Sequence, residues 1–138
     1  MKPAVGYSGT PLAKKLGITE GSRVLLERAP KNYPELLAPI PPGVRFETRL
    51  SENTDVVHVF AESCEVLART LKRLRTSIRP NATIWVSWPK KASKVRTDIT
   101  EDRIREVALP MGLVDIKVCA VSEVWSGLKL VIRKELRQ

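Results

Sequence analysis

The chain has 138 residues, which is the size of one ordinary domain and is long enough to bury a single substantial core. Its hydrophobic fraction of 43% and charged fraction of 28% are close to globular averages, which argues against a disordered chain. Its formal net charge of +9, from 24 Lys and Arg against 15 Asp and Glu, attracts polyanions over long range.

This positive charge has two interpretations. Nucleic acid, a nucleotide, an acidic protein or anionic lipid would each be drawn to such a surface. Alternatively, the basic charge only keeps the protein soluble. We expect a single domain over residues 1–138, with residues 1–21 forming an N-terminal arm.

The N-terminal arm contains one short predicted helix. Pro11 suits its first helical position, Thr10 is a candidate N-cap, and Gly17 is expected to end it. The preceding GYSGT run could cradle a phosphate, with Lys14 following. This run lacks the spacing of known phosphate loops, so an arm packed on the surface is the alternative.

A short buried strand is predicted at residues 23–26 (RVLL), followed by a brief helix over residues 34–37. In a nucleotide-binding Rossmann unit, a glycine-rich loop would follow this strand. The sequence has no glycine there, and Arg28, Ala29 and Pro30 block close approach of the backbone. We therefore expect no dinucleotide or adenosyl group bound in the standard way over this turn.

Two further strands follow. Residues 44–50 alternate between apolar and polar side chains, which indicates an edge strand with one solvated face. Residues 56–60 (VVHVF) are almost continuously apolar, which is typical of a central parallel strand that is buried on both faces. His58 lies within this run and is predicted to be a hydrogen-bonded core histidine, because no second catalytic side chain is near it in sequence.

The clearest helix is predicted at residues 64–78, after Glu62 and Ser63, which can satisfy its first N–H groups. An apolar stripe of leucines would dock on the sheet. The other face is strongly basic and is a candidate for polyanion contact, although a solvated surface is the usual role of such a face. Its basic residues are Arg69, Lys72, Arg73, Arg75 and Arg79.

The stretch at residues 82–91 (ATIWVSWPKK) is predicted to hold a second central strand over residues 83–86. The carboxyl ends of parallel strands face the ligand crevice, so the exit after this strand is a candidate site. Trp88 could stack on a base or another aromatic ligand while Lys90 and Lys91 meet phosphate. Alternatively, Trp88 only covers the end of the sheet.

A second long helix is expected to begin after Asp98 or Thr100, either of which could cap it. The last segment alternates over residues 114–121 and again over residues 128–132. These two strands are predicted to form a hairpin with Ser126-Gly127 in its turn.

The metal-ligating residues are few. Cys64 and Cys119 lie far apart without a CxxC pair, and His58 is the only histidine, so an ordinary zinc site of Cys and His is excluded. We expect no metal and no cofactor. No apolar run has the length of a signal peptide or a membrane span, so we expect a cytoplasmic protein without a membrane partner.

The predicted topology over Asp55 to Arg133 resembles the C-terminal half of class I methyltransferase domains, whose last strand is inserted antiparallel. The resemblance implies an α/β fold, namely a Rossmann-like three-layer sandwich with a mostly parallel central sheet that ends in an antiparallel C-terminal hairpin. The acidic, glycine-rich loop that binds adenosylmethionine in those domains is missing after the RVLL strand.

A string of short motifs carries a second resemblance. The motifs are GYSGTPL (6–12), KLGI (15–18), SWPKK (87–91), TD (97–98), ALP (108–110), GLVD (112–115), KVCAV (117–121) and WSGLK (125–129). Together they resemble the family of small bacterial proteins called domain of unknown function 3052. This resemblance covers most of the chain and supports the fold, but it implies no substrate.

The first functional hypothesis is a non-catalytic binding or regulatory module for an anionic partner, which could be a nucleotide, nucleic acid or an acidic protein. We predict no catalytic residues. The candidate ligand contacts are Tyr7, Ser8, Thr10, Lys14, Ser87, Trp88, Lys90, Lys91, Trp125 and Lys129. A shared site requires that the tryptophans, Lys90 and the GYSGT arm meet at one pocket.

Two alternatives remain open. One is a small methyltransferase-like transferase with a non-standard adenosyl site built from Glu27, Asp55 and the turn at residues 61–63. The other is an interaction or regulatory subunit that pairs with another chain through the hairpin carrying Trp125, since tryptophans often anchor interfaces.

Overall fold

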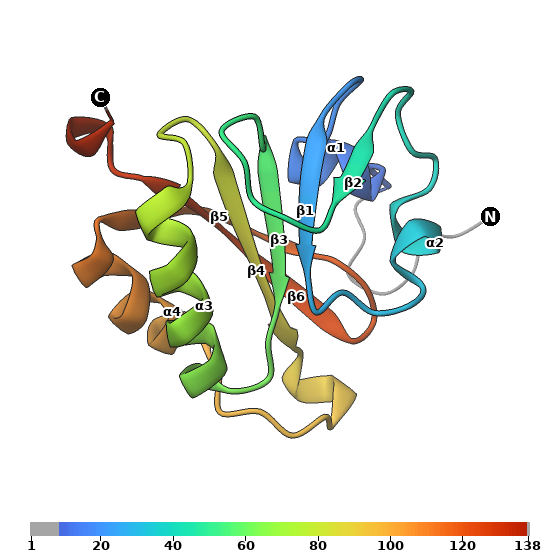
Figure 1. Cartoon of the computed structure of the whole chain (residues 1–138). Coiled ribbons are helices and arrows are strands. Elements are labelled where there is room, and N and C mark those ends of the chain that lie inside the picture. The colour runs from blue at the N-terminus through green and yellow to red at the C-terminus, as the bar shows by residue number, and fades with distance from the viewer. Residues whose placement is uncertain (1–8, 138) are drawn as a thin grey trace.

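A central sheet of six strands, in the order β2-β1-β3-β4-β6-β5, organises the computed structural model, which describes residues 9–137 (Figure 1). The strands are β1 (Arg23–Glu27), β2 (Arg45–Glu47), β3 (Val56–Phe60), β4 (Thr83–Pro89), β5 (Leu113–Ala120) and β6 (Trp125–Ile132). The first four are parallel, and β6 lies antiparallel between β4 and β5. The predicted mostly parallel sheet with an antiparallel C-terminal hairpin is confirmed.

Helices cover both faces of the sheet, which gives three layers. Helices α3 (Cys64–Ser77) and α4 (Glu101–Ala108) lie on one face, and α1 (Leu12–Leu16) and α2 (Tyr33–Leu37) lie on the other (Figure 1). Each face has its own buried cluster. Short 3-10 turns occur at Lys91–Ser93, Leu109–Met111 and Lys134–Leu136.

Both long helices begin at hydroxyl caps. The Ser63 hydroxyl accepts a hydrogen bond from the Val66 N–H, and the Thr100 hydroxyl accepts one from the Arg103 N–H. Thr100 rather than Asp98 therefore caps α4. The predicted leucine stripe of α3 is fully buried against the sheet, as the spacing of Leu67, Leu71 and Leu74 requires.

The hairpin differs from the predicted one. Strand β6 begins at Trp125, so Ser126 and Gly127 lie inside a strand and the turn falls at residues 121–124. Gly127 is required by packing, because a Cβ there would lie only 3.0 Å from a methyl carbon of Val121 and 3.3 Å from the Trp85 ring. The glycine thus marks a close approach within the sheet instead of a turn.

Strand β4 is three residues longer than predicted. Ser87, Trp88 and Pro89 pair with Gly127, Ser126 and Trp125 of β6, so they belong to the sheet. The prediction placed them after the strand because Pro89 reads as a break in an isolated run. Pairing with the antiparallel neighbour extends the strand.

Smaller differences concern the edges and one cap. Strand β2 is at the edge, as expected, but is shorter than predicted. The opposite edge, β5, has an irregularity between Asp115 and Lys117, and Ile116 there is 53% exposed. At α1 the N-cap position falls on Pro11, and no Thr10 cap bond forms. None of the helices within residues 9–137 is long and apolar enough to cross a membrane.

Candidate ligand pocket at the carboxyl ends of the strands

A pocket of about 840 Å³ opens where β1 and β3 end, at the edge of the sheet where ligands of α/β proteins usually bind. We call it the strand-end pocket. It is lined by the turn after β1 (Arg28, Pro30), the end of β3 with the start of α3 (residues 60–63 and Val66), the loop at residues 96–98, and Trp125.

The turn after β1 replaces the missing glycine loop with a strained arginine. Arg28 has φ 62°, in the left-handed region that favours glycine. For a residue with a Cβ this conformation costs roughly 1–2 kcal/mol. Strain of this kind is often retained where it positions a functional group, and here it places an exposed guanidinium at the pocket.

One wall of the pocket is aromatic. The rings of Trp125 and Phe60 meet edge to face, with centroids 5.0 Å apart and planes at 88°. Phe60 is itself buried and stacks on His58 with a centroid distance of 4.3 Å. Because this cluster holds Phe60 rigidly, the half-buried Trp125 ring has a fixed support and can offer a flat apolar surface to a ligand.

The polar rim is held together by contacts between distant segments. Asp98 accepts the Cys64 N–H at 2.8 Å, and the Thr97 hydroxyl donates to the Glu62 carbonyl at 2.6 Å. The Cys64 and Val66 N–H groups in the first turn of α3 are thus already bonded, to Asp98 and to the Ser63 cap. The arginine side chains then remain as the main donors for an anionic ligand.

Arg28 and Arg96 supply those side chains. Within residues 9–137, neither forms a hydrogen bond or an ion pair. Glu62 is exposed, and its carboxylate also has no partner in that range. The pocket thus combines an aromatic wall, two cations with free donors and two carboxylates, Glu62 and Asp98, of which Asp98 already accepts the Cys64 N–H.

The predicted ligand contacts do not meet at this pocket, apart from Trp125. Ser87 is fully buried and its hydroxyl lies 2.7 Å from His58 Nε2, while Trp88 is only 8% exposed and packs into the core cluster beneath α3. Neither lines a described pocket, so we leave both out of the ligand site.

The other predicted contacts are distributed elsewhere. The Lys90 N–H donates to the Val124 carbonyl, and Lys91 starts a 3-10 turn. Neither side chain is part of the lining of the strand-end pocket. Thr10 and Lys14 line a separate cleft beside β5 and β6, and Lys129 lies on β6. Tyr7 and Ser8 fall outside the described residues. One shared site for the tryptophans, Lys90 and the arm does not form.

The basic face of α3 is largely used within the molecule. Arg73 pairs with Glu27 at 2.9 Å, and Arg75 Nε donates to the Met111 carbonyl at 2.9 Å. Arg69 has only a loose exposed pairing with Glu65, at 3.8 Å. Of the five predicted polyanion contacts, Lys72 is exposed and has no partner among residues 9–137, and Arg79 joins a separate network.

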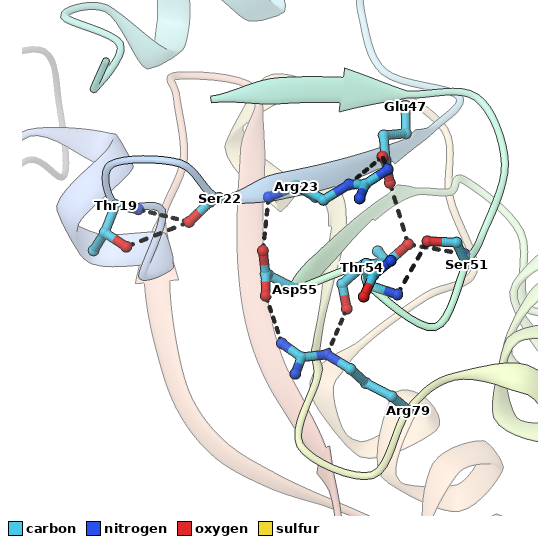
Figure 2. Close-up of polar contacts among 9 residues, drawn as sticks. Thr19, Ser22, Arg23, Glu47, Ser51, Thr54, Asp55 and Arg79 are labelled. Atoms are coloured by element: carbon cyan, nitrogen blue, oxygen red, sulfur yellow. Dashed lines mark hydrogen bonds and ion pairs between the residues drawn. The ribbon is translucent and has the colours of Figure 1, made fainter. Parts of the chain in front are cut away.

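That network lies at the amino ends of β1 and β3 (Figure 2). The Asp55 carboxylate accepts the Arg23 backbone N–H at 2.8 Å and pairs with Arg79, while Arg23 pairs with Glu47. Asp55 directly precedes β3, so it sits at the end of the sheet opposite the strand-end pocket. The expectation that Asp55 joins an adenosyl site with Glu27 is therefore wrong.

The core histidine is confirmed as hydrogen-bonded. His58 is fully buried, and the Tyr33 hydroxyl lies 2.9 Å from its Nδ1 on the side opposite Ser87. Burial lowers the pKa of His58 to about 3, so the imidazole is neutral. The pKa of Tyr33 is raised, also by burial. This chain of three side chains stabilises the core and does not reach the pocket.

Neither cysteine is activated. The pKa of Cys64 is raised chiefly by partial burial, and burial also raises the pKa of Cys119. Within residues 9–137, no group of three His, Cys, Asp or Glu side chains could hold a metal ion.

Sequence reasoning treated Arg28 as an obstacle and missed Arg96. The only local sequence feature that pointed to these two arginines is a basic residue shortly after a strand, Arg28 in ERAP and Arg96 in KVRTD. What makes Arg96 part of the site is the bond from Thr97 to Glu62, which lies 35 positions away, and no local pattern encodes it.

No family model matches this sequence, and no curated protein matches it either. Among solved structures, the fibrillarin of Aeropyrum pernix with natively bound S-adenosyl-L-methionine has a TM-score of 0.59 at 15% identity, covering 91% of this chain and 70% of that one. A protein in the NADB-Rossmann superfamily from Streptococcus agalactiae has a TM-score of 0.53 at 10% identity, covering 93% and 70%.

These likenesses concern the fold alone, because the identities are low. They agree with the sheet order in giving this chain a Rossmann-like fold with methyltransferase-like topology. The resemblance to domain of unknown function 3052 stays a prediction, because no family model matches the sequence.

Proposed function

We propose that the chain is a binding module for a small anionic ligand of the nucleotide class, held in the strand-end pocket. The observation that carries this proposal is that Arg28 and Arg96, both without partners among residues 9–137, line the same pocket as Trp125. A flat aromatic surface beside two guanidinium groups suits a base linked to phosphate.

Each part of a nucleotide has a counterpart in the pocket. The base stacks on Trp125, which Phe60 supports from its edge. The phosphate oxygens accept hydrogen bonds from Arg28 and Arg96, whose planar groups match phosphate geometry. The Glu62 carboxylate accepts hydrogen bonds from ribose hydroxyls, as an acidic residue does in Rossmann sites. No backbone loop is needed to hold the phosphate.

A binding or regulatory role is favoured over catalysis by the chemistry of the pocket side chains. Among the described lining residues, Ser63 is the one hydroxyl at the helix start, and its oxygen already caps Val66. No histidine lies beside it, because the single histidine is sealed in the core. The described lining residues therefore offer no serine paired with a histidine base, which covalent catalysis of the serine type needs.

The test is titration with ADP, followed by calorimetry and by tryptophan emission, with Trp125→Phe showing which part of the signal comes from Trp125. We expect Arg28→Gln and Arg96→Gln each to weaken binding about tenfold or more, because each removes a hydrogen bond to a charged group. Arg45→Gln is the matched control, since Arg45 is also exposed and without a side-chain partner among residues 9–137 but lies at the other end of the sheet. Absence of binding at millimolar ADP, or equal losses in all three variants, would refute the proposal.

The second candidate is a methyltransferase-like transferase with a non-standard adenosyl site. Two observations favour it: the turn at residues 61–63 lines the pocket together with Trp125, and the fibrillarin neighbour is a structure with S-adenosyl-L-methionine bound. Glu27, one of the expected adenosyl contacts, is instead paired with Arg73, and this pairing weakens the case for the transferase. S-adenosyl-L-methionine has one carboxylate and no phosphate, so Arg28→Gln together with Arg96→Gln should weaken its binding less than that of ADP. Tighter binding of this compound than of ADP would favour the transferase.

A further inference from the structure

A second cleft, of about 750 Å³, lies between the segment of α1 and the hairpin of β5 and β6. We call it the lysine cleft. Lys14 and Lys15 of α1 line it together with Lys117 of β5, and Thr10 and Ser126 add two hydroxyl groups. It shares no lining residue with the strand-end pocket, so it is a separate site.

The lysine cleft has no acidic side chain in the part of its wall that the structure describes. The ion pairs between residues 9–137 are all made by arginines, so neither Lys14 nor Lys117 takes part in one. The Lys15 ammonium lies 3.5 Å from the Ala120 carbonyl, which anchors it at the wall of the cleft.

The strand register adds a fourth lysine next to the cleft. Lys117 and Lys129 are directly opposed on β5 and β6, so their side chains leave the same face of the sheet as neighbours. Like charges in this position are destabilising, and an uncompensated pair is retained at a cost to the fold. An anion bound between the cations would remove that repulsion.

Cys119 also lines the cleft, and the pKa of its thiol shows that lysines from both walls lie near one point. Its pKa is raised by burial, while the positive charges of Lys15 and Lys117 act in the opposite direction. Two lysines more than 100 positions apart are therefore both close enough to act on one half-buried thiol. The positive potential is focused inside the concave region, where it is screened less than on an open surface.

We propose that the lysine cleft binds a compact anion carrying two or more phosphate groups. Lysine ammonium groups act as point charges with rotatable donors, which suits phosphate oxygens without selecting a planar group. A concave site of about 750 Å³ has room for a chain of phosphates. The phosphates could belong to a free inorganic polyphosphate or to the tail of a nucleotide, and the test separates these sources.

The experiment uses sodium tripolyphosphate and the full chain. In calorimetry we expect Lys14→Gln and Lys117→Gln each to weaken tripolyphosphate binding about tenfold, because each removes a charged donor. Lys72→Gln is the matched control, since Lys72 is an exposed lysine of α3 without a partner among residues 9–137. When Arg28→Gln and Arg96→Gln are both present, Lys14→Gln and Lys117→Gln should each still cause the same loss, which separates this cleft from the strand-end pocket.

Thermal unfolding gives a second readout that does not depend on binding heat. We expect Lys129→Gln to raise the Tm of the free protein, because it relieves the cross-strand repulsion, and to reduce the rise in Tm that tripolyphosphate causes. ATP binding that survives Arg28→Gln but is lost in Lys117→Gln would assign the phosphates to a nucleotide tail. Equal losses in Lys14→Gln and Lys72→Gln, or tighter binding of a single-stranded oligonucleotide than of tripolyphosphate, would overturn the proposal.

Discussion

The hydroxyl of Ser87 lies 2.7 Å from Nε2 of His58, between neighbouring parallel strands in the interior of the protein. Tyr33 completes the chain from α2, with its hydroxyl 2.9 Å from Nδ1. Both ring nitrogens are therefore satisfied without water, and the core tolerates an imidazole only in its neutral form. The pH dependence of stability follows from this arrangement.

The first prediction is that acid weakens the protein through His58. Its folded pKa is about 3, against about 6.5 in the unfolded chain. Above pH 6.5 both states are neutral there and His58 contributes no pH dependence. Between pH 6.5 and about pH 3 the unfolded chain binds a proton that the folded protein does not, so the free energy of unfolding falls by up to about 1.4 kcal/mol per pH unit.

Urea denaturation between pH 7 and pH 4 measures this slope. His58→Gln keeps hydrogen-bonding groups at the site but cannot titrate, so the difference in slope between it and the natural chain isolates the histidine from the carboxylates. Identical slopes for the two proteins would show that His58 can be protonated in the folded state.

The second prediction separates two roles of Asp55. Asp55→Asn keeps an acceptor for the Arg23 N–H but loses the ion pair with Arg79 (Figure 2). Because both side chains of that pair are about one-third exposed, we expect a loss of at most about 1 kcal/mol in the free energy of unfolding. Asp55→Ala also leaves the N–H without its acceptor, which costs about 1–3 kcal/mol.

Chemical denaturation of the two Asp55 variants measures the difference. Neither substitution should alter ligand binding, because Asp55 lies at the opposite end of the sheet from the strand-end pocket. A loss of ADP binding in Asp55→Asn alone would contradict this placement and revive an adenosyl role for the carboxylate.

The parts of the fold that could be predicted are those with a strong local period. The continuous apolar run of β3 and the leucine stripe of α3 each determine their own structure. The hairpin turn was misplaced because Ser126-Gly127 reads locally as a turn. Its glycine is needed for a contact with Trp85 on another strand, and such a requirement has no local sequence signal.

Sequence reasoning placed the main candidate site at the exit of β4, whereas the strand-end pocket opens where β1 and β3 end. The carboxyl ends of the parallel strands and the start of α3 at Glu62 and Ser63 could be located from the sequence. Trp88 could not be distinguished from Trp125 as the pocket residue, because only the pairing of β4 with β6 decides which of them is buried. Arg96 required the fold of a loop that is held by bonds to distant residues.

The third prediction concerns Gly127. Gly127→Ala brings a methyl group to 3.0 Å from Val121 and 3.3 Å from the Trp85 ring, both within the buried face. Overpacking of this kind costs about 1–3 kcal/mol. It should also disturb the hydrogen bond from Trp85 Nε1 to the Leu16 carbonyl, which joins α1 to the sheet. We expect a lower Tm and a red-shifted emission, whereas Ser126→Ala, at the neighbouring position, should leave both nearly unchanged.

The fourth prediction separates the effect of Arg28 on stability from its effect on ligand binding. Its left-handed conformation is natural for glycine and strained for alanine, by roughly 1–2 kcal/mol, while glycine loses up to about 1 kcal/mol more through entropy of the unfolded chain. We therefore expect Arg28→Gly to be more stable than Arg28→Ala by up to about 1 kcal/mol. Both variants lack the guanidinium and should bind ADP equally poorly. Denaturation and ADP titration of the pair measure the two effects separately. If Arg28→Ala were the more stable variant, the turn would not be strained; if it retained full affinity, Arg28 would position the loop without contacting the ligand.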